Sequence, residues 1–243
     1  MISIKQVFNQ SIVIGTTCLS VYGVMSYQNS NQMGVLQSQL DSIKAQDEKD
    51  KTLGQYALNM MSQTSASTKL SDAKKQTLAR SIVKISNDVF ETDEQKKAFI
   101  AVLAIESEFI RNAQSPTGPK GLSQVSKAAF VEGTAYCGLG ATHDEDVWET
   151  DINLYAGACY FRALLDKHQD PYIAIVAYNQ GPNSKDSKTF AKNGRMDSVE
   201  VLKYVARFNY LKRVVTETKS LLVVEPQAIK LKSKSTIIMS VPN

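Results

Sequence analysis

One carboxylate stands out in this chain because it follows a long run of apolar residues. Glu106 comes directly after Phe99, Ile100, Ala101, Val102, Leu103, Ala104 and Ile105. Burial disfavours the charged form of a carboxyl group and raises its pKa. An acid that keeps its proton near neutral pH can protonate the leaving oxygen of a glycosidic bond. The alternative is that Glu106 faces solvent at the end of its helix.

A second carboxylate, Glu108, follows two residues later. On a helix, residues two apart point about 200° away from each other. Glu106 and Glu108 are therefore not expected to act in one site, and Glu106 is the single candidate acid.

Four blocks of residues accompany this glutamate at fixed spacing. They are Glu106-Ser107 with Phe109, Ala113, Ser115-Pro116, Gly118 and Gly121-Leu122-Ser123-Gln124; Asn153, Ala156-Gly157 and Tyr160; Ala177-Tyr178-Asn179-Gln180-Gly181; and Tyr210. In this order and spacing they resemble the lytic transglycosylase (SLT) domain, a lysozyme-like fold. The resemblance covers about 115 residues. Ser123, Pro119 and Ala206 depart from it, since many members carry Met, Ala and Glu at these places.

The resemblance implies roles for single residues. Glu106 is the expected catalytic residue, acting as acid and then as base. Expected substrate contacts are Ser107, Gly121, Leu122, Ser123, Gln124, Tyr178, Asn179 and Tyr210. The hydroxyl of Tyr210 is expected near Glu106, and Tyr160 is expected in the core.

The resemblance also implies a substrate and a product. The substrate is peptidoglycan, cut between N-acetylmuramic acid and N-acetylglucosamine with a 1,6-anhydro product. We expect the enzyme to open the cell wall locally for a machine that crosses the envelope, with a bacteriophage virion protein acting at genome ejection as the best fit. Alternatives are a transglycosylase of a secretion or conjugation system, a hydrolytic goose-type lysozyme, and a non-catalytic virion protein with a lysozyme-like domain. The expected location is the virion and then the host periplasm, or the inner membrane facing the periplasm.

The composition excludes several other classes of protein. The 243 residues are 43% hydrophobic and 21% charged, which argues against a disordered chain and a multi-pass membrane protein. Two histidines make a His-based zinc site or a Ser-His-Asp triad improbable, and no metal or cofactor is expected. A net charge of +4 is too small to indicate a specific nucleic-acid partner. Cys137 and Cys159 could pair in an oxidising compartment, but we favour free thiols.

The two ends of the chain differ in composition from its middle. Residues 1–30 are apolar but diluted by Ser, Thr and Gly, and predict a hydrophobic anchor or membrane-inserting helix, a helix buried against protein partners, or a signal peptide. Residues 31–69 predict an amphipathic linker helix, with Leu36, Leu40 and Ile43 on one face, and a loop. Residues 221–243 form a basic tail. The N-terminal helix and the tail are the expected contacts with other virion or envelope proteins.

Between these ends, residues 70–220 predict a single, mainly α, lysozyme-like domain. Apolar residues recur at helical spacing after Ser71-Asp72, which predicts a helix of about 18 residues. Thr92 and Gln95 have capping-box spacing and predict the start of a helix that runs past Glu106 to Phe109. Further helices are expected over 124–132, 154–168, 171–179 and 198–218. The acidic stretch 133–151 reads as an insertion, and we expect a solvated loop there rather than a Ca²⁺ site.

Overall fold

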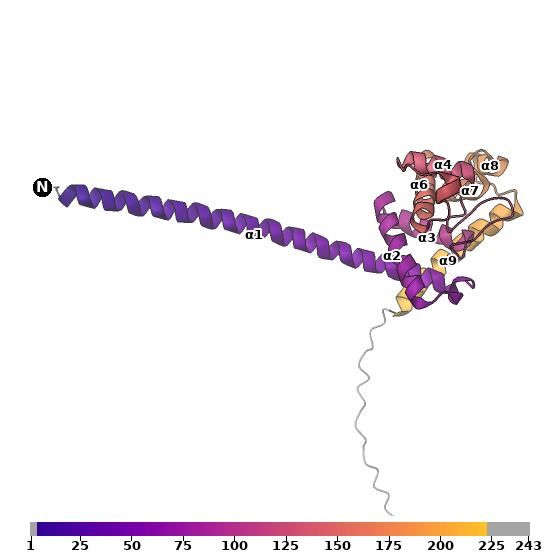
Figure 1. The fold of residues 1–243 in the computed structure, drawn as a ribbon, viewed down its shortest axis with the longest axis horizontal. Coiled ribbons are helices and arrows are strands. Elements are labelled where there is room, and N and C mark those ends of the chain that lie inside the picture. The colour runs from indigo at the N-terminus through magenta and orange to yellow at the C-terminus, as the bar shows by residue number, and fades with distance from the viewer. Residues whose placement is uncertain (1–3, 223–243) are drawn as a thin grey trace, which may run out of the picture. The chain divides into compact units, whose positions relative to one another are not determined.

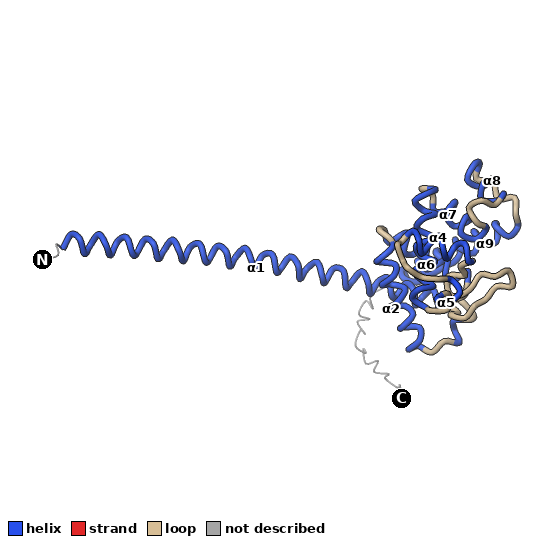
Figure 2. Tube along the Cα trace, turned by 45° about the horizontal axis from the view of Figure 1, so that its top comes forward, coloured by secondary structure: helices blue, strands red, loops and turns tan. Residues whose placement is uncertain are grey.

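The computed structural model describes residues 4–222, with side chains described for residues 32–216. Its regular structure is helical, and Figure 2 shows no strand in this part of the chain. The mainly α class predicted from the sequence is confirmed. The chain divides into two compact units, residues 1–53 and 54–243.

The first unit consists of one helix. Helix α1 (Ile4–Ser62) is continuous across residue 30 and extends into the second unit (Figure 1). Its residues Met33, Leu36, Leu40 and Ile43 are exposed. No helix within residues 4–222 is both long enough and apolar enough to cross a bilayer. The hydrophobic anchor at residues 1–30 stays a prediction, and most of the predicted basic tail, residues 223–243, lies outside the described residues.

The second unit contains the end of α1 and a set of shorter helices (Figure 1). In chain order they are η1 (Ser67–Lys69), α2 (Asp72–Val89), α3 (Asp93–Glu106), α4 (Lys127–Tyr136), α5 (His143–Asp146), α6 (Thr150–His168), α7 (Pro171–Gln180), α8 (Lys185–Asn193) and α9 (Val199–Leu222). The sequence pattern predicted most of these helices, but not α8 or the single turn α5. Both are short, and α8 carries only one large apolar residue, Phe190, so periodicity had little to act on.

The helix that carries Glu106 starts where the sequence predicts. Thr92 accepts a hydrogen bond from the Gln95 amide, and the Gln95 side chain accepts from the Thr92 amide, which completes a capping box. Further along α3, the seven residues from Ala98 to Ala104 are each at most 3% exposed. Such a helix must be covered on all sides, and α2, α7 and α9 pack against it. The last residue of α3, Glu106, lies at the wall of a cleft.

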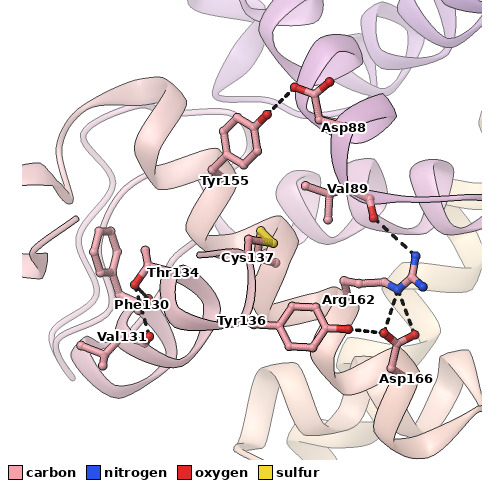
Figure 3. Close-up of a disulfide and its surroundings, with 11 residues drawn as sticks. Asp88, Val89, Phe130, Val131, Thr134, Tyr136, Cys137, Tyr155, Arg162 and Asp166 are labelled. Atoms are coloured by element: carbon pink, nitrogen blue, oxygen red, sulfur yellow. Dashed lines mark hydrogen bonds and ion pairs between the residues drawn. A yellow bond between two sulfur atoms is a disulfide. The ribbon is translucent and has the colours of Figure 1, made fainter. Parts of the chain in front are cut away.

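Helix α4 lies unusually close to α6. A Cβ at Gly133 would overlap the carbonyl oxygen of Ala156, so only glycine permits this approach. At the end of α4, Cys137 forms a disulfide with Cys159 of α6, with Cα atoms 5.9 Å apart (Figure 3). The prediction of free thiols is therefore wrong. The spacing of 22 residues could not show that two helices bring these sulfurs together.

Polar contacts add to this tie between helices. Tyr136 of α4 donates a hydrogen bond to Asp166 of α6. Asp166 also accepts a hydrogen bond of 2.9 Å from Nε of Arg162 (Figure 3). Arg162 donates at 2.8 Å to Glu91, just after α2. Together with the disulfide, the bond from Tyr136 fixes α4 on α6, whereas Arg162 ties α6 to the residue that follows α2. Helix α4 forms part of the cleft wall described below.

Candidate active site

Glu106 is the last residue of α3 and is half-buried at the wall of a cleft. Beyond it the chain leaves the helix, since Ser107 is the C-cap and Glu108 and Phe109 adopt φ values of +50° and +63°. The hydroxyl of Tyr204 in α9 donates a hydrogen bond of 2.6 Å to Oε1 of Glu106. Burial raises the pKa of Glu106 to about 7, and the hydrogen bond from Tyr204 opposes this rise. The acid therefore holds its proton in a large fraction of molecules near neutral pH.

The tyrosine at this glutamate is not the one predicted from the sequence. Tyr204 is buried, whereas Tyr210 is 52% exposed and does not line the cleft. Six residues along a helix correspond to a rotation of about 240°, so the two side chains of α9 point to different faces. The hydroxyl expected beside Glu106 is thus that of Tyr204, and the substrate contact of Tyr210 stays a prediction. The expected pattern of a Glu four residues before the Tyr is present as Glu200 and Tyr204. It lies six residues earlier than the positions where we expected it, Ala206 and Tyr210.

Glu106 opens onto a cleft with a volume of about 870 Å³. Its walls come from the end of α3, the loop that follows, the first turns of α4, one residue of α6, the end of α7 and the start of α9. Residues on these walls include Glu106, Ser107, Glu108, Gln114, Ser115, Gln124, Ser126, Tyr160, Tyr178, Asn179, Gly181 and Glu200. Of the predicted site residues, the structure thus brings Glu106, Ser107, Gln124, Tyr178 and Asn179 to one cleft.

The segment Gly121–Ser123 supports the cleft wall and does not line the cleft. All three residues are buried and none of them lines the cleft, so their contact with substrate stays a prediction. The Ser123 amide donates at 2.8 Å to Oδ1 of buried Asn153, and Gly121, at φ +78°, approaches Asn153 so closely that a Cβ would overlap the amide. Asn153 in turn donates to the carbonyl oxygens of Lys120 and Val147. One asparagine of α6 therefore fixes the loop that follows the catalytic helix.

Gln124 keeps this loop in shape from its other side. Its Nε2 donates to the carbonyl oxygens of Ala113 and Gly121, both at 2.8 Å, across the narrow part of the loop. The Gly121 amide donates to the same carbonyl of Ala113 at 2.8 Å. Because the amide nitrogen of Gln124 is already bonded within the loop, its carbonyl oxygen is the group left to meet a ligand in the cleft.

Tyr178 connects α7 to the same loop. Its hydroxyl donates at 2.7 Å to the carbonyl oxygen of Ser123, and its ring lies 5.4 Å from that of Tyr160. Gly157 makes room for this bond, since a Cβ there would overlap the Ser123 side chain and lie 3.1 Å from the Tyr178 hydroxyl. Tyr160, which we expected only in the core, also reaches the cleft. Neighbouring Asn179 accepts a hydrogen bond from Gln180 at 2.6 Å.

Glu108 is held as an anion. Arg207 of α9 donates to it at 2.8 Å, and the backbone amide of Ala66 donates at 2.8 Å. These bonds, led by that from Ala66, lower its pKa. The two neighbouring carboxyl groups thus have opposite properties, and Glu108 cannot serve as the acid near neutral pH.

Three residues at the site were not assigned a role from the sequence. Tyr204 and Glu200 were missed because of the register chosen in α9, although their spacing was visible. Asn153 was part of a matching block, but nothing in the sequence said that its side chain reaches the loop at 120–123. No group of three or more His, Cys, Asp or Glu side chains that could hold a metal ion occurs among the described residues.

A half-buried acid with its pKa raised to about 7, at the wall of a polar cleft, is the arrangement with which glycoside-cleaving enzymes protonate a leaving group. The helical fold narrows this class. Residues 91–200 match the transglycosylase SLT domain family. The chain therefore carries an SLT domain of the lysozyme-like superfamily and is a lytic transglycosylase that acts on peptidoglycan. No curated protein shows significant similarity to the chain.

Replacing Tyr204 by Phe tests how the acid is tuned. The hydrogen bond from Tyr204 stabilises the ionised form of Glu106, so its loss raises the pKa of Glu106 above about 7. We expect the alkaline limb of the kcat/KM profile to move to higher pH, and the rate at pH 6 to fall about tenfold because the carboxylate is no longer held in position. Tyr210→Phe, on the exposed face of the same helix, is the matched control and should leave the profile unchanged. If the alkaline limb of the profile did not move in Tyr204→Phe, this would contradict the conclusion that Tyr204 tunes the pKa of Glu106.

Proposed function

We propose that Glu106 alone performs both proton transfers of the lytic reaction, between N-acetylmuramic acid and N-acetylglucosamine. The observation that carries this proposal is the raised pKa of Glu106, to about 7, at the wall of the cleft. A group that must give a proton and later take one works best with a pKa near the working pH. Glu108 is tied to Arg207 and does not compete for this role.

In the first step, protonated Glu106 gives its proton to the glycosidic oxygen. The bond between that oxygen and C1 of the muramoyl sugar breaks, and the electron pair stays with the departing oxygen. The positive charge that develops at C1 is stabilised by the N-acetyl group of the substrate or by nearby dipoles. In the second step, ionised Glu106 takes the proton of the muramoyl C6 hydroxyl, whose oxygen bonds to C1. The product is a 1,6-anhydro sugar, no water is consumed, and Glu106 is protonated again.

Several residues of the cleft would position the glycan strand. Asn179 and the carbonyl oxygen of Gln124 offer polar groups to the N-acetyl amides of the sugars, while Tyr160 and Tyr178 offer apolar ring surface. Ser107 donates to the carbonyl of Leu103 and accepts from the amide of Phe109, both at 3.2 Å. It would therefore act mainly by holding the turn that presents Glu106.

Product analysis tests this reaction directly. Purified sacculi are incubated with the full chain, and the released fragments are analysed by mass spectrometry. We expect muropeptides with 1,6-anhydro ends, which are 18 Da lighter than the hydrolytic products because no water is added. Reducing ends instead would indicate the goose-type hydrolytic reaction, and the absence of any fragment would favour a structural, non-catalytic role.

We further propose that the enzyme serves a machine that crosses the bacterial envelope, in the first place a phage virion during genome ejection. This proposal is supported by the long helix α1, which precedes the enzymatic domain and exposes Leu36, Leu40 and Ile43, and by the basic tail in the sequence. α1 and the tail would bind other proteins of the particle, and residues 1–30 could insert into a membrane after ejection. Detection of the chain in purified virions would support the virion over a secretion or conjugation system.

A further inference from the structure

A basic groove adjoins the cleft on its α7 side. It has a volume of about 410 Å³ and is lined by Asn183, Lys185, Lys188, Thr189 and Lys192. We call these five residues the lysine groove. The three lysines are three and four residues apart and therefore lie on one face of α8, over an axial length of about 10 Å.

The lysines of this groove have no anionic partner among the residues whose side chains are described. None of them takes part in an ion pair among the described residues, in contrast to Lys51, Lys84 and Lys127. The nearest acid in sequence, Asp186, projects about 100° around the helix from Lys185. Like charges spaced three to four residues apart on a helix are mutually unfavourable. Three of them on a nine-residue helix form a surface that an anion would stabilise.

Helix α8 is fixed in place relative to the cleft. The carbonyl oxygen of Gly181, a residue of the cleft wall, accepts from the Ser187 hydroxyl at 2.7 Å and from the Ser184 amide at 3.2 Å. Opposite the lysines, Phe190 packs against the core cluster of Val176, Val201 and Val205. Gly181 of the cleft and Asn183 of the lysine groove are two residues apart, so their Cα atoms are within about 8 Å.

We propose that the lysine groove binds the free carboxylates of the short peptides that peptidoglycan strands carry on their muramic acid residues. The inference rests on the proposed function, because it places the sugar chain in the cleft beside Glu106. A strand that leaves the cleft past Gly181 reaches α8 next. There its peptide, an acidic substituent at regular intervals, meets a row of lysines. The groove thereby favours strands that still carry peptides over bare glycan.

The test compares two forms of one substrate. Glycan strands with peptides, and the same strands freed of peptides by an amidase, are given to the full chain and to the triple variant Lys185→Gln, Lys188→Gln, Lys192→Gln. For the variant we expect KM on peptide-bearing strands to rise about tenfold at low salt, with kcat unchanged. KM on bare strands should not change. The difference in KM between the variant and the unchanged protein should become smaller in 0.5 M salt, which screens exposed charges.

Two further variants separate the groove from general effects. Lys49→Gln, Lys74→Gln, Lys167→Gln removes the same net charge at exposed positions outside the groove and the cleft, and should behave as the unchanged protein. Lysine to arginine at the three groove positions keeps the charge and should restore KM. Unaltered melting of each variant would exclude misfolding.

An equal loss on both substrates, or no loss on either, would overturn the groove assignment while leaving the lytic reaction intact. Loss of binding to an anionic wall polymer without any effect on peptide-bearing strands would also overturn it. If the unchanged protein released no anhydro product, the proposed function would fail by itself. Co-sedimentation with the two kinds of strand would then still report whether the groove prefers peptides.

Discussion

Replacing Glu106 by Gln is expected to lower the release of anhydro-muropeptides by at least about 10³-fold. The amide has the size of the carboxyl group and can still accept the 2.6 Å hydrogen bond from Tyr204. It can neither give a proton to the glycosidic oxygen nor take one from the C6 hydroxyl. Both steps lose their proton carrier, so the effect should fall on kcat, while binding of glycan strands persists.

The neighbouring carboxyl group provides the control. Glu108→Gln removes a carboxylate of the same cleft, two residues away, whose lowered pKa keeps it ionised. We expect this variant to retain activity within about tenfold, since its charge serves the ion pair with Arg207. The measurement is the rate of anhydro-muropeptide release from sacculi, quantified by mass spectrometry. An active Glu106→Gln with an inactive Glu108→Gln would reverse the assignment.

The activity of the unchanged protein should follow the ionisation of Glu106. The first step needs the protonated acid, and the pKa of Glu106 is about 7. We therefore expect kcat/KM on soluble strands to fall as pH rises through about 7, tenfold for each further pH unit. A rate independent of pH from 6 to 9 would be incompatible with Glu106 as the acid of the free enzyme.

The sequence predicted the fold well because the helices carry local signals. The capping box at Thr92 and Gln95, the proline at the start of α7 and the apolar run of α3 each act within a few residues. The same run identified Glu106, since a carboxylate at its end has few ways to reach water. These features need no knowledge of the tertiary structure.

The remainder of the site depends on which residues meet across the fold. Tyr204 and Tyr210 lie on one helix, and spacing alone does not say which of them faces α3. The block Gly121–Ser123 matched the family pattern, but its residues are buried, and the Ser123 backbone bonds to Asn153 and Tyr178. Residues that match a family motif can thus be buried residues that support the cleft as well as residues that contact the ligand. The disulfide of Cys137 and Cys159 depends in the same way on the close packing of α4 on α6.

The second large effect concerns stability, because a half-buried acid that must ionise destabilises the folded state. The pKa of Glu106 is raised from 4.5 to about 7. Between these values the unfolded chain has lost the proton while the folded protein keeps it, so the stability of the folded protein falls as pH rises. Above the higher value the loss is complete, at roughly 3 kcal/mol. Gln does not titrate, so Glu106→Gln should be about 3 kcal/mol more stable than the unchanged protein at pH 8. This difference in stability between Glu106→Gln and the unchanged protein should be small at pH 5.

Urea unfolding at pH 5 and pH 8 measures this difference, and Glu108→Gln is again the matched control. Its carboxyl has a lowered pKa, so its ionised form stabilises the folded state above the unfolded pKa and that contribution is lost as pH falls. Glu108→Gln should therefore be less stable than the unchanged protein at pH 8, opposite in sign to Glu106→Gln. If Glu106→Gln gave no gain at pH 8, the side chain would be hydrated and unable to hold its proton. The same environment that makes Glu106 an acid near neutral pH would then be missing, and the catalytic assignment would lose its physical basis.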